Sequence, residues 1–118
     1  MVIWESFARL LAKKVLGLLA REYMEYEGEK VEILFVRRLI PGWAWAQTWG
    51  RVILVRADHG DENSLNFLLR HEVVHVRQWK KYGFFFPFAY LFSSVKAFLS
   101  GKHPYYDNEF EAEAYKRG

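Results

Sequence analysis

The residues His71-Glu72-Val73-Val74-His75 decide how this sequence folds and what it is able to bind. They lie within Leu65–Trp79, a run whose apolar residues predict a helix. Residues four apart share one face of a helix, so His71 and His75 can direct two imidazole nitrogens at one metal ion. Glu72 lies one step further round, within reach of a water on that metal. Two neutral nitrogen ligands beside a carboxylate base are typical of zinc-assisted hydrolysis.

The predicted helix runs from about Ser64 to Tyr82, and Gly83 ends it. Asp61, Asn63 or Ser64 is the candidate cap at its start. Apolar residues occur on nearly every side of this helix, which indicates that it is buried. A buried histidine is destabilising unless its nitrogens are satisfied, and one metal ion satisfies a nitrogen on both histidines. The environment of the motif therefore favours a metal site.

The segment Ile3–Tyr26 has apolar residues at roughly helical spacing and Lys or Arg on the other side, which predicts an amphipathic helix. Gly28 is the expected stop of this helix. A basic polar face is also typical of helices that lie on membrane surfaces. We favour a helix that covers the sheet of its own domain, because so short a chain needs one.

Three segments predict strands, namely Val31–Leu39, Trp43–Thr48 and Arg51–Arg56. Pro41-Gly42 predicts a turn between the first two. Strands that follow one another in series predict a small, mostly antiparallel three-stranded sheet. Downstream of the motif helix, the sequence predicts two further helices, so we expect an α+β fold.

The first of these two helices covers about Phe88–Leu99, with Pro87 in its first turn. The second covers Glu109–Lys116, with Asn108 or Asp107 as its cap.

Two aromatic groups allow alternative interpretations. Trp43, Trp45 and Trp49 are interpreted first as packing residues of the sheet, and second as an aromatic wall that grips substrate side chains. The segment Phe84–Leu99 is short for a membrane span and is interrupted by polar residues. We expect it to pack against the motif helix. The alternative is an apolar patch that rests on a membrane or binds a partner.

The bulk composition predicts one packed domain over residues 1–118, because 52% of the 118 residues are hydrophobic and 19% are aromatic. A net charge of +3 is too small to indicate a nucleic-acid partner. The absence of cysteine excludes disulfides and cysteine-ligated zinc, so histidine and carboxylate must hold any metal. We find no secretory signal and no transmembrane segment in the sequence, and we therefore expect a cytoplasmic protein.

A catalytic zinc site needs a third protein ligand and an open position for water. The candidates lie in or near the predicted final helix; they are His103, Asp107, Glu109, Glu111 and Glu113.

The motif and this final helix together resemble the gluzincins, the zinc peptidases of the thermolysin type. In that family the third ligand is a Glu on a second helix downstream of H-E-x-x-H, commonly in the pattern Glu-x-x-Ala-Asp. Glu111-Ala112-Glu113-Ala114-Tyr115 matches this pattern up to its last position. The resemblance implies that Glu111 is the third zinc ligand, with Glu109 as the fallback. The family's Asp supports a ligand histidine, and Tyr115 stands in its place here. That role then falls to Asp107, Tyr115 or the backbone.

The arrangement resembles most closely the minigluzincins, which are very small single-domain versions of the zincin-like fold. The resemblance implies that a strand around Thr48–Ile53 lines the cleft and pairs with an extended peptide. It also implies peptide-bond hydrolysis by zinc-activated water, with Glu72 as the general base. Thermolysin-like enzymes stabilise the oxyanion with a Tyr and a His from outside this core. The candidates for that role here are His103, Tyr105 and Tyr106.

The sequence thus predicts a zinc-dependent metalloendopeptidase whose partner is a peptide or protein substrate in an extended conformation. Two alternatives remain. One is a catalytically silent, zinc-stabilised binding module. The other is a peripheral protein that binds a membrane or a partner through Ile3–Leu19 and Phe84–Phe92. Membrane contact is possible but not favoured by the sequence, and the oligomeric state is open.

Overall fold

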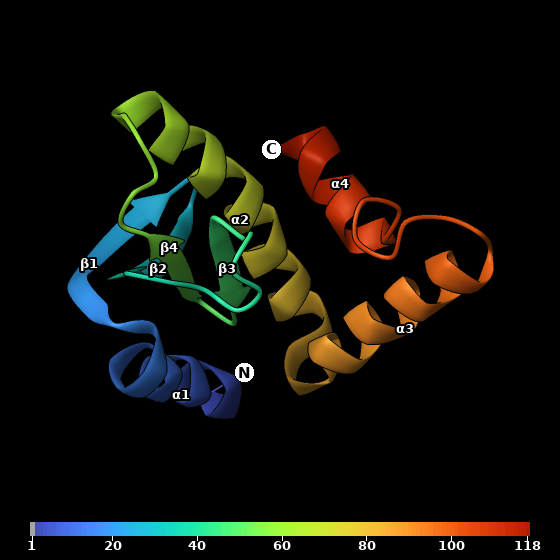
Figure 1. Ribbon diagram of the computed structural model, residues 1–118, viewed down its shortest axis with the longest axis horizontal. Coiled ribbons are helices and arrows are strands. Elements are labelled where there is room, and N and C mark those ends of the chain that lie inside the picture. The colour runs from blue at the N-terminus through green and yellow to red at the C-terminus, as the bar shows by residue number, and fades with distance from the viewer. Residues whose placement is uncertain (1) are drawn as a thin grey trace.

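The sheet at the centre of the molecule is covered by a helix on each face. The computed structural model describes residues 2–118, and Figure 1 shows their arrangement. The elements follow in the order α1 (Val2–Leu11), a π-helical turn (Ala12–Leu16), β1 (Leu18–Tyr26), β2 (Glu29–Val36), β3 (Ala46–Trp49), β4 (Val52–Arg56), α2 (Glu62–Tyr82), a 3-10 turn (Gly83–Phe85), α3 (Phe86–Leu99) and α4 (Glu109–Arg117). The predicted α+β class is confirmed.

Strands β2 and β4 form the buried middle of the sheet, and their side chains alternate between two cores. Leu34 and Leu54 face α1, where Ala8 packs against them. Ile33 and Ile53 face α2 and pack against its apolar residues. Because both faces are covered, β4 is an unbroken run of buried apolar residues rather than an alternating one.

The strand order is β1-β2-β4-β3, in a mixed sheet. β1 and β2 pair antiparallel, β2 and β4 pair parallel, and β4 and β3 pair antiparallel. The prediction of a three-stranded, mostly antiparallel sheet is therefore wrong in strand number and in the central pairing. The physical reason is that β3 does not insert between β2 and β4. It pairs with the far side of β4 and becomes an edge of the sheet.

The extra strand is Leu18–Tyr26, which the sequence assigned to a single helix over Ile3–Tyr26. The helical part ends earlier, at Gly17, which has a left-handed backbone (φ 73°). β1 is mostly exposed, so alternation of apolar and polar residues did not mark it. Gly28 is part of the turn between β1 and β2, rather than a helix stop. The preference for a helix that covers its own sheet does hold for Val2–Leu16.

The motif helix α2 ends at Tyr82, as predicted, and begins at Glu62, two residues before the predicted start. The Asp61 side chain accepts a hydrogen bond from the Ser64 amide at 2.9 Å, and Gly83 terminates the helix with a positive φ. The final helix α4 begins, as predicted, at Asn108, whose side chain accepts from the Phe110 amide at 2.8 Å. α4 lies beside α2, which brings the C-terminal part of the chain to the motif (Figure 1).

Helix α3 differs from the prediction that it packs as a core helix. Phe86 is buried against Trp79 and Phe110, but most of the large apolar side chains of α3 are exposed. The segment Glu62–Leu99, which comprises α2, the 3-10 turn and α3, is also long and apolar enough to cross a membrane by length and composition alone. Only 17% of its most apolar window is buried.

Candidate metal centre

The motif residues lie in the middle of α2, and the two histidines face α4 rather than the core of the sheet. His71, Glu72 and His75 are 6%, 5% and 5% exposed. The neighbouring Val73 and Val76 face the opposite way and pack against the sheet. The alternation follows from the helical period, which separates the motif face from the sheet face of α2.

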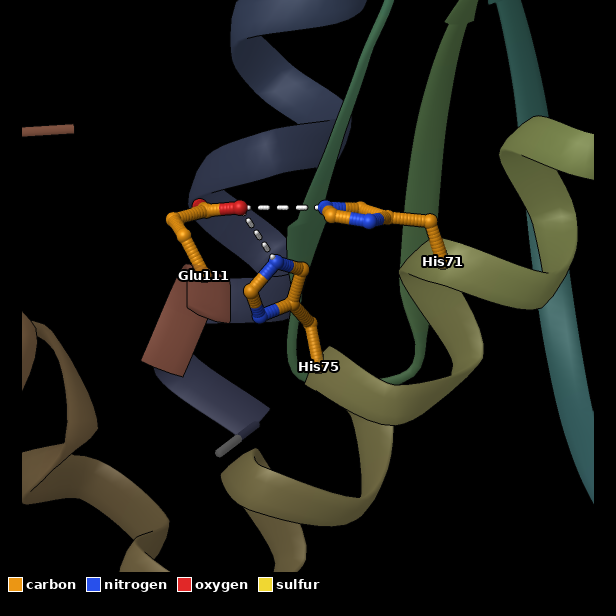
Figure 2. Close-up of side chains that lie close together, drawn as sticks. All are labelled: His71, His75 and Glu111. Atoms are coloured by element: carbon orange, nitrogen blue, oxygen red, sulfur yellow. Dashed lines mark hydrogen bonds and ion pairs between the residues drawn. The ribbon is translucent and has the colours of Figure 1, made fainter. Parts of the chain in front are cut away.

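Glu111 meets both histidines from the first turn of α4. Its Oε1 lies 3.0 Å from His71 Nε2 and 3.1 Å from His75 Nε2. Figure 2 shows the three side chains converging from two helices. One ligand atom from each of these residues lies within 4.8 Å of the others, and all three residues are buried. The fold thus brings together the three residues that the sequence grouped, His71, His75 and Glu111.

The second carboxylate oxygen of Glu111 is also hydrogen-bonded. The Tyr90 hydroxyl of α3 donates a hydrogen bond to Glu111 Oε2 at 2.7 Å. Burial alone would raise the pKa of Glu111, but the hydrogen bonds with His71 and His75 outweigh it and hold the pKa well below its usual range. Burial and the charge of Glu111 raise the pKa of Tyr90, which therefore stays a hydrogen-bond donor. Glu111 is consequently an ionised carboxylate that is held in a fixed orientation between the two histidines.

His75 is oriented by Gln78. The His75 Nδ1 lies 2.7 Å from Gln78 Oε1, and an amide oxygen can only accept, so Nδ1 carries the proton. The Gln78 amide nitrogen donates to the Phe110 carbonyl at 3.0 Å and to Glu113 Oε1 at 2.6 Å. With the proton on Nδ1, the Nε2 lone pair of a neutral His75 is directed at the cluster. Burial would lower the pKa of His75, but Glu111 and the nearby Glu72 outweigh it and raise it to about 9.

His71 has a different environment. Its Nδ1 is buried and has no hydrogen-bond partner among residues 2–118. The Tyr115 ring packs against the imidazole, with 4.4 Å between the ring centroids. Tyr115 therefore contacts His71 by ring packing rather than by a hydrogen bond to Nδ1.

Glu72 adjoins the cluster and is held by the sheet. The Thr48 hydroxyl of β3 donates to Glu72 Oε1 at 2.8 Å, and Glu72 Oε2 lies 4.0 Å from His71 Nε2. Burial raises the pKa of Glu72 above its usual range, even though the neighbouring histidines and Thr48 act in the opposite direction. A carboxylate whose pKa is raised by burial is suited to accept and return a proton near neutral pH.

The cluster opens into a cleft of about 940 Å³ between β3, α2, α3 and α4. Trp43 and Trp45 line this cleft and are 61% and 46% exposed, so the interpretation of these two as packing residues is wrong. Trp49 is the one of the three that packs inward, between Trp4 and Trp79. Its packing is consistent with the first interpretation.

The three candidates for oxyanion stabilisation also line the cleft; they are His103, Tyr105 and Tyr106. His103 Nδ1 accepts hydrogen bonds from the backbone amides of Tyr105 and Tyr106, which folds this loop back on itself. The Tyr105 hydroxyl lies 3.4 Å from the Tyr115 hydroxyl, next to the His71 ring.

The remaining acidic candidates lie outside the cluster. Asp107 accepts a hydrogen bond from the His103 amide, and Glu113 accepts one from Gln78. Glu109 is exposed in the first turn of α4. Sequence reasoning did not single out Thr48, Gln78 or Tyr90. Helical spacing could have identified Gln78, which lies three residues after His75 on the same face of α2.

The residues present fit a zinc ion. Two histidine nitrogens and one carboxylate oxygen are the protein ligands of many catalytic zinc sites. Ligands of a tetrahedral zinc lie about 3.3 Å from one another, given bond lengths of 2.0–2.1 Å. The separations of 3.0 and 3.1 Å from Glu111 Oε1 to the two Nε2 atoms are close to that value. Searches against protein-family models, curated proteins and solved structures found no match to this chain.

Proposed function

We propose that this chain is a zinc-dependent metallopeptidase of the gluzincin type, with the zincin-like arrangement of the minigluzincins. His71, His75 and Glu111 hold the zinc ion, and Glu72 is the general base. The proposal rests mainly on one observation. Glu111 Oε1 lies within hydrogen-bond distance of both histidine Nε2 atoms, although Glu111 is 36 residues after His75 and on another helix. If the H-E-x-x-H pattern were a chance feature of a buried helix, nothing would require a carboxylate from another helix beside both histidines.

A bound zinc ion lowers the pKa of a water molecule and polarises a carbonyl group. The protein's part of the reaction is proton transfer. Glu72 accepts the proton of the attacking water and returns it to the nitrogen of the leaving amine. Thr48 donates to Glu72 Oε1, so Oε2 is the oxygen turned toward His71 and the cluster. The Thr48 hydroxyl thus orients the base.

The proposed substrate is an extended peptide that pairs with β3. This strand is an edge of the sheet, and its residues line the cleft. The Trp45 carbonyl bonds to β4, and the Thr48 carbonyl bonds away from it, to the Trp79 indole. Since backbone groups alternate in direction along a strand, Ala46 presents its N–H and C=O at the open edge. The exposed side chains of Trp43 and Trp45 line the same cleft, where they are available to contact substrate side chains.

The test is cleavage of an unstructured protein by purified, zinc-loaded chain. We expect fragments with zinc, none with a chelator, and none from Glu72→Gln. Glu109→Gln is the matched control, because Glu109 is an exposed acid of α4 outside the cluster. No turnover by the zinc-loaded wild type, or unchanged turnover by Glu72→Gln, would contradict the enzyme function.

A second candidate function is a zinc-stabilised binding module without catalysis. It is favoured by the unpartnered Nδ1 of His71, because catalytic zinc sites usually support each ligand histidine through its second nitrogen. This function predicts zinc-dependent folding and binding of extended peptides without hydrolysis. A zinc-loaded protein that binds peptides and leaves them intact would favour it over the peptidase.

A further inference from the structure

Helix α3 turns its two serines toward α4 and most of its large apolar residues outward. The Ser93 and Ser94 hydroxyls bond to the start of α4, at the Glu109 amide and the Asn108 side chain. Asn108 also donates to the Tyr90 carbonyl at 2.9 Å. These contacts fix the rotation of α3. The opposite side of the helix is consequently the one that carries most of its phenylalanine and leucine.

The outward side is a continuous apolar stripe. Positions 85, 88, 92, 95 and 99 follow the i, i+3, i+4 spacing of one helix face. We call this stripe and its neighbours on α1 the apolar face. Its exposed residues are Phe85 of the 3-10 turn, Phe88, Leu91, Phe92, Val95, Phe98 and Leu99 of α3, and Ile3 and Phe7 of α1. Phe92 and Leu99 are 71% and 78% exposed. A monomeric soluble domain rarely leaves so many large apolar side chains in water.

Helix α1 continues the apolar face at the N-terminal end of α3. The Trp4 indole nitrogen donates to the Phe84 carbonyl at 3.0 Å, and the two rings lie 5.7 Å apart. Figure 1 shows the start of α1 beside the turn between α2 and α3. The apolar side chains of the two helices are thereby joined across this contact.

The charges along α3 and its flanking turns have one sign. Residues 83–106 contain no Asp or Glu, and their lysines are Lys96 and Lys102. On α1 the one acid is Glu5, which accepts a hydrogen bond from the Arg51 amide. Lys96 and Lys102 are exposed beside the stripe and after it. An apolar surface bordered by cations complements acyl chains beneath anionic headgroups. It complements a second copy of the same cationic surface poorly.

We propose that the apolar face rests on an anionic lipid bilayer, with α3 lying in the plane of the membrane interface. α3 has 14 residues, or about 21 Å of helix, which is shorter than a hydrocarbon core of about 30 Å. Asn108 ties the start of α4 to the middle of α3, and α4 carries Glu111 to the histidines. An in-plane α3 keeps this cluster on the aqueous side.

The first test is co-sedimentation of the purified chain with vesicles. We expect binding to phosphatidylcholine vesicles that contain phosphatidylglycerol, and weaker binding to phosphatidylcholine alone or at high salt. Replacing both Phe88 and Phe92 by Ser should weaken binding by at least about tenfold, since each exposed ring contributes apolar area. Lys96→Gln and Lys102→Gln should each weaken it by about fivefold on anionic vesicles alone.

The second test uses the absence of cysteine, which allows a dye at one chosen position. A polarity-sensitive dye on Phe92→Cys should shift to the blue and brighten with anionic vesicles. The same dye on Asn63→Cys, an exposed position at the opposite end of α2, should not change. Absent vesicle binding at low salt, or equal binding by the Phe88 and Phe92 double variant, would overturn the proposal. So would self-association that this variant abolishes without vesicle binding, which would assign the face to a second copy.

Discussion

The Gln78 side chain accepts a hydrogen bond from His75 Nδ1 at 2.7 Å and links this histidine to α4 through the Phe110 carbonyl. The contact fixes the tautomer of His75 and its position relative to Glu111. We therefore expect Gln78→Ala to weaken zinc binding by about 10–100-fold. Titration against a competing chelator measures the affinity. Asn66→Ala, at an exposed position of the same helix, is the control, and equal affinities for Gln78→Ala and this control would contradict the role.

The ligand set leads to a prediction about metal content. His71→Ala and Glu111→Ala should each lose bound zinc after dialysis, because two ligands hold the ion far less tightly than three. Glu109→Ala should keep a full equivalent, since Glu109 lies outside the cluster. Atomic absorption of the dialysed proteins measures the outcome, with circular dichroism to show that each variant is folded. Retention of zinc by a folded Glu111→Ala would place the third ligand elsewhere.

Thr48 provides a prediction for the reaction itself. Its hydroxyl donates to Glu72 Oε1, a hydrogen bond that lowers the pKa of Glu72 against the effect of burial. Thr48→Val removes this donor, so the pKa of Glu72 should rise and the acid limb of the pH–rate profile should move to higher pH. Peptide turnover should fall about tenfold to hundredfold, from the loss of a hydrogen bond to a charged group. Zinc content should not change.

The pH profile separates the orienting role of Thr48 from a structural one. A general loss of packing would lower turnover at every pH and leave the limb in place. Thr48→Ser keeps the hydroxyl and should restore both the rate and the position of the limb. A Thr48→Val profile that superimposes on the wild type after scaling would contradict the prediction.

The part of the site that the sequence predicted is the part that local geometry determines. His71 and His75 share a helix face because they are four residues apart, whatever the rest of the chain does. Glu111 was assigned through the gluzincin resemblance, and the structure brings its carboxylate to both histidines. Tyr90 could not be predicted, because its role depends on how α3 is rotated against α4. No periodicity within α3 contains that information.

The fold was predicted least well where the segments are exposed. Leu18–Tyr26 is built from residues such as Leu, Glu, Arg and Met, which favour helices, and it forms a strand because β2 offers it a partner. β4 was predicted well because its continuous run of Val, Ile and Leu is buried on both faces. β2 and β4 are neighbours and pair in parallel because β3 lies at the edge of the sheet rather than between them. The order of the strands along the sequence does not determine this arrangement.

The protonation of the cluster predicts opposite pH dependences for the metal-free and the zinc-bound protein. The folded metal-free protein raises the pKa of His75 to about 9, from 6.5. A histidine with a raised pKa contributes stability that is fully present below pH 6.5 and is lost as the pH rises through 9. The raised pKa of Glu72 acts in the same direction. The lowered pKa of Glu111 acts at the acid end, where its contribution is lost as the pH falls below about 4.5.

Zinc requires a neutral His75, so protons compete with the metal and its affinity should rise with pH up to about 9. Between pH 6.5 and 9 the chelated protein should therefore lose thermal stability, while the stabilisation by added zinc grows. Thermal melts with chelator and with zinc across this range measure both slopes. His75→Gln should flatten the slope of the chelated protein, because the group that titrates is gone. If the stability of the chelated protein and the stabilisation by added zinc changed in the same direction with pH, His75 would not control either pH dependence.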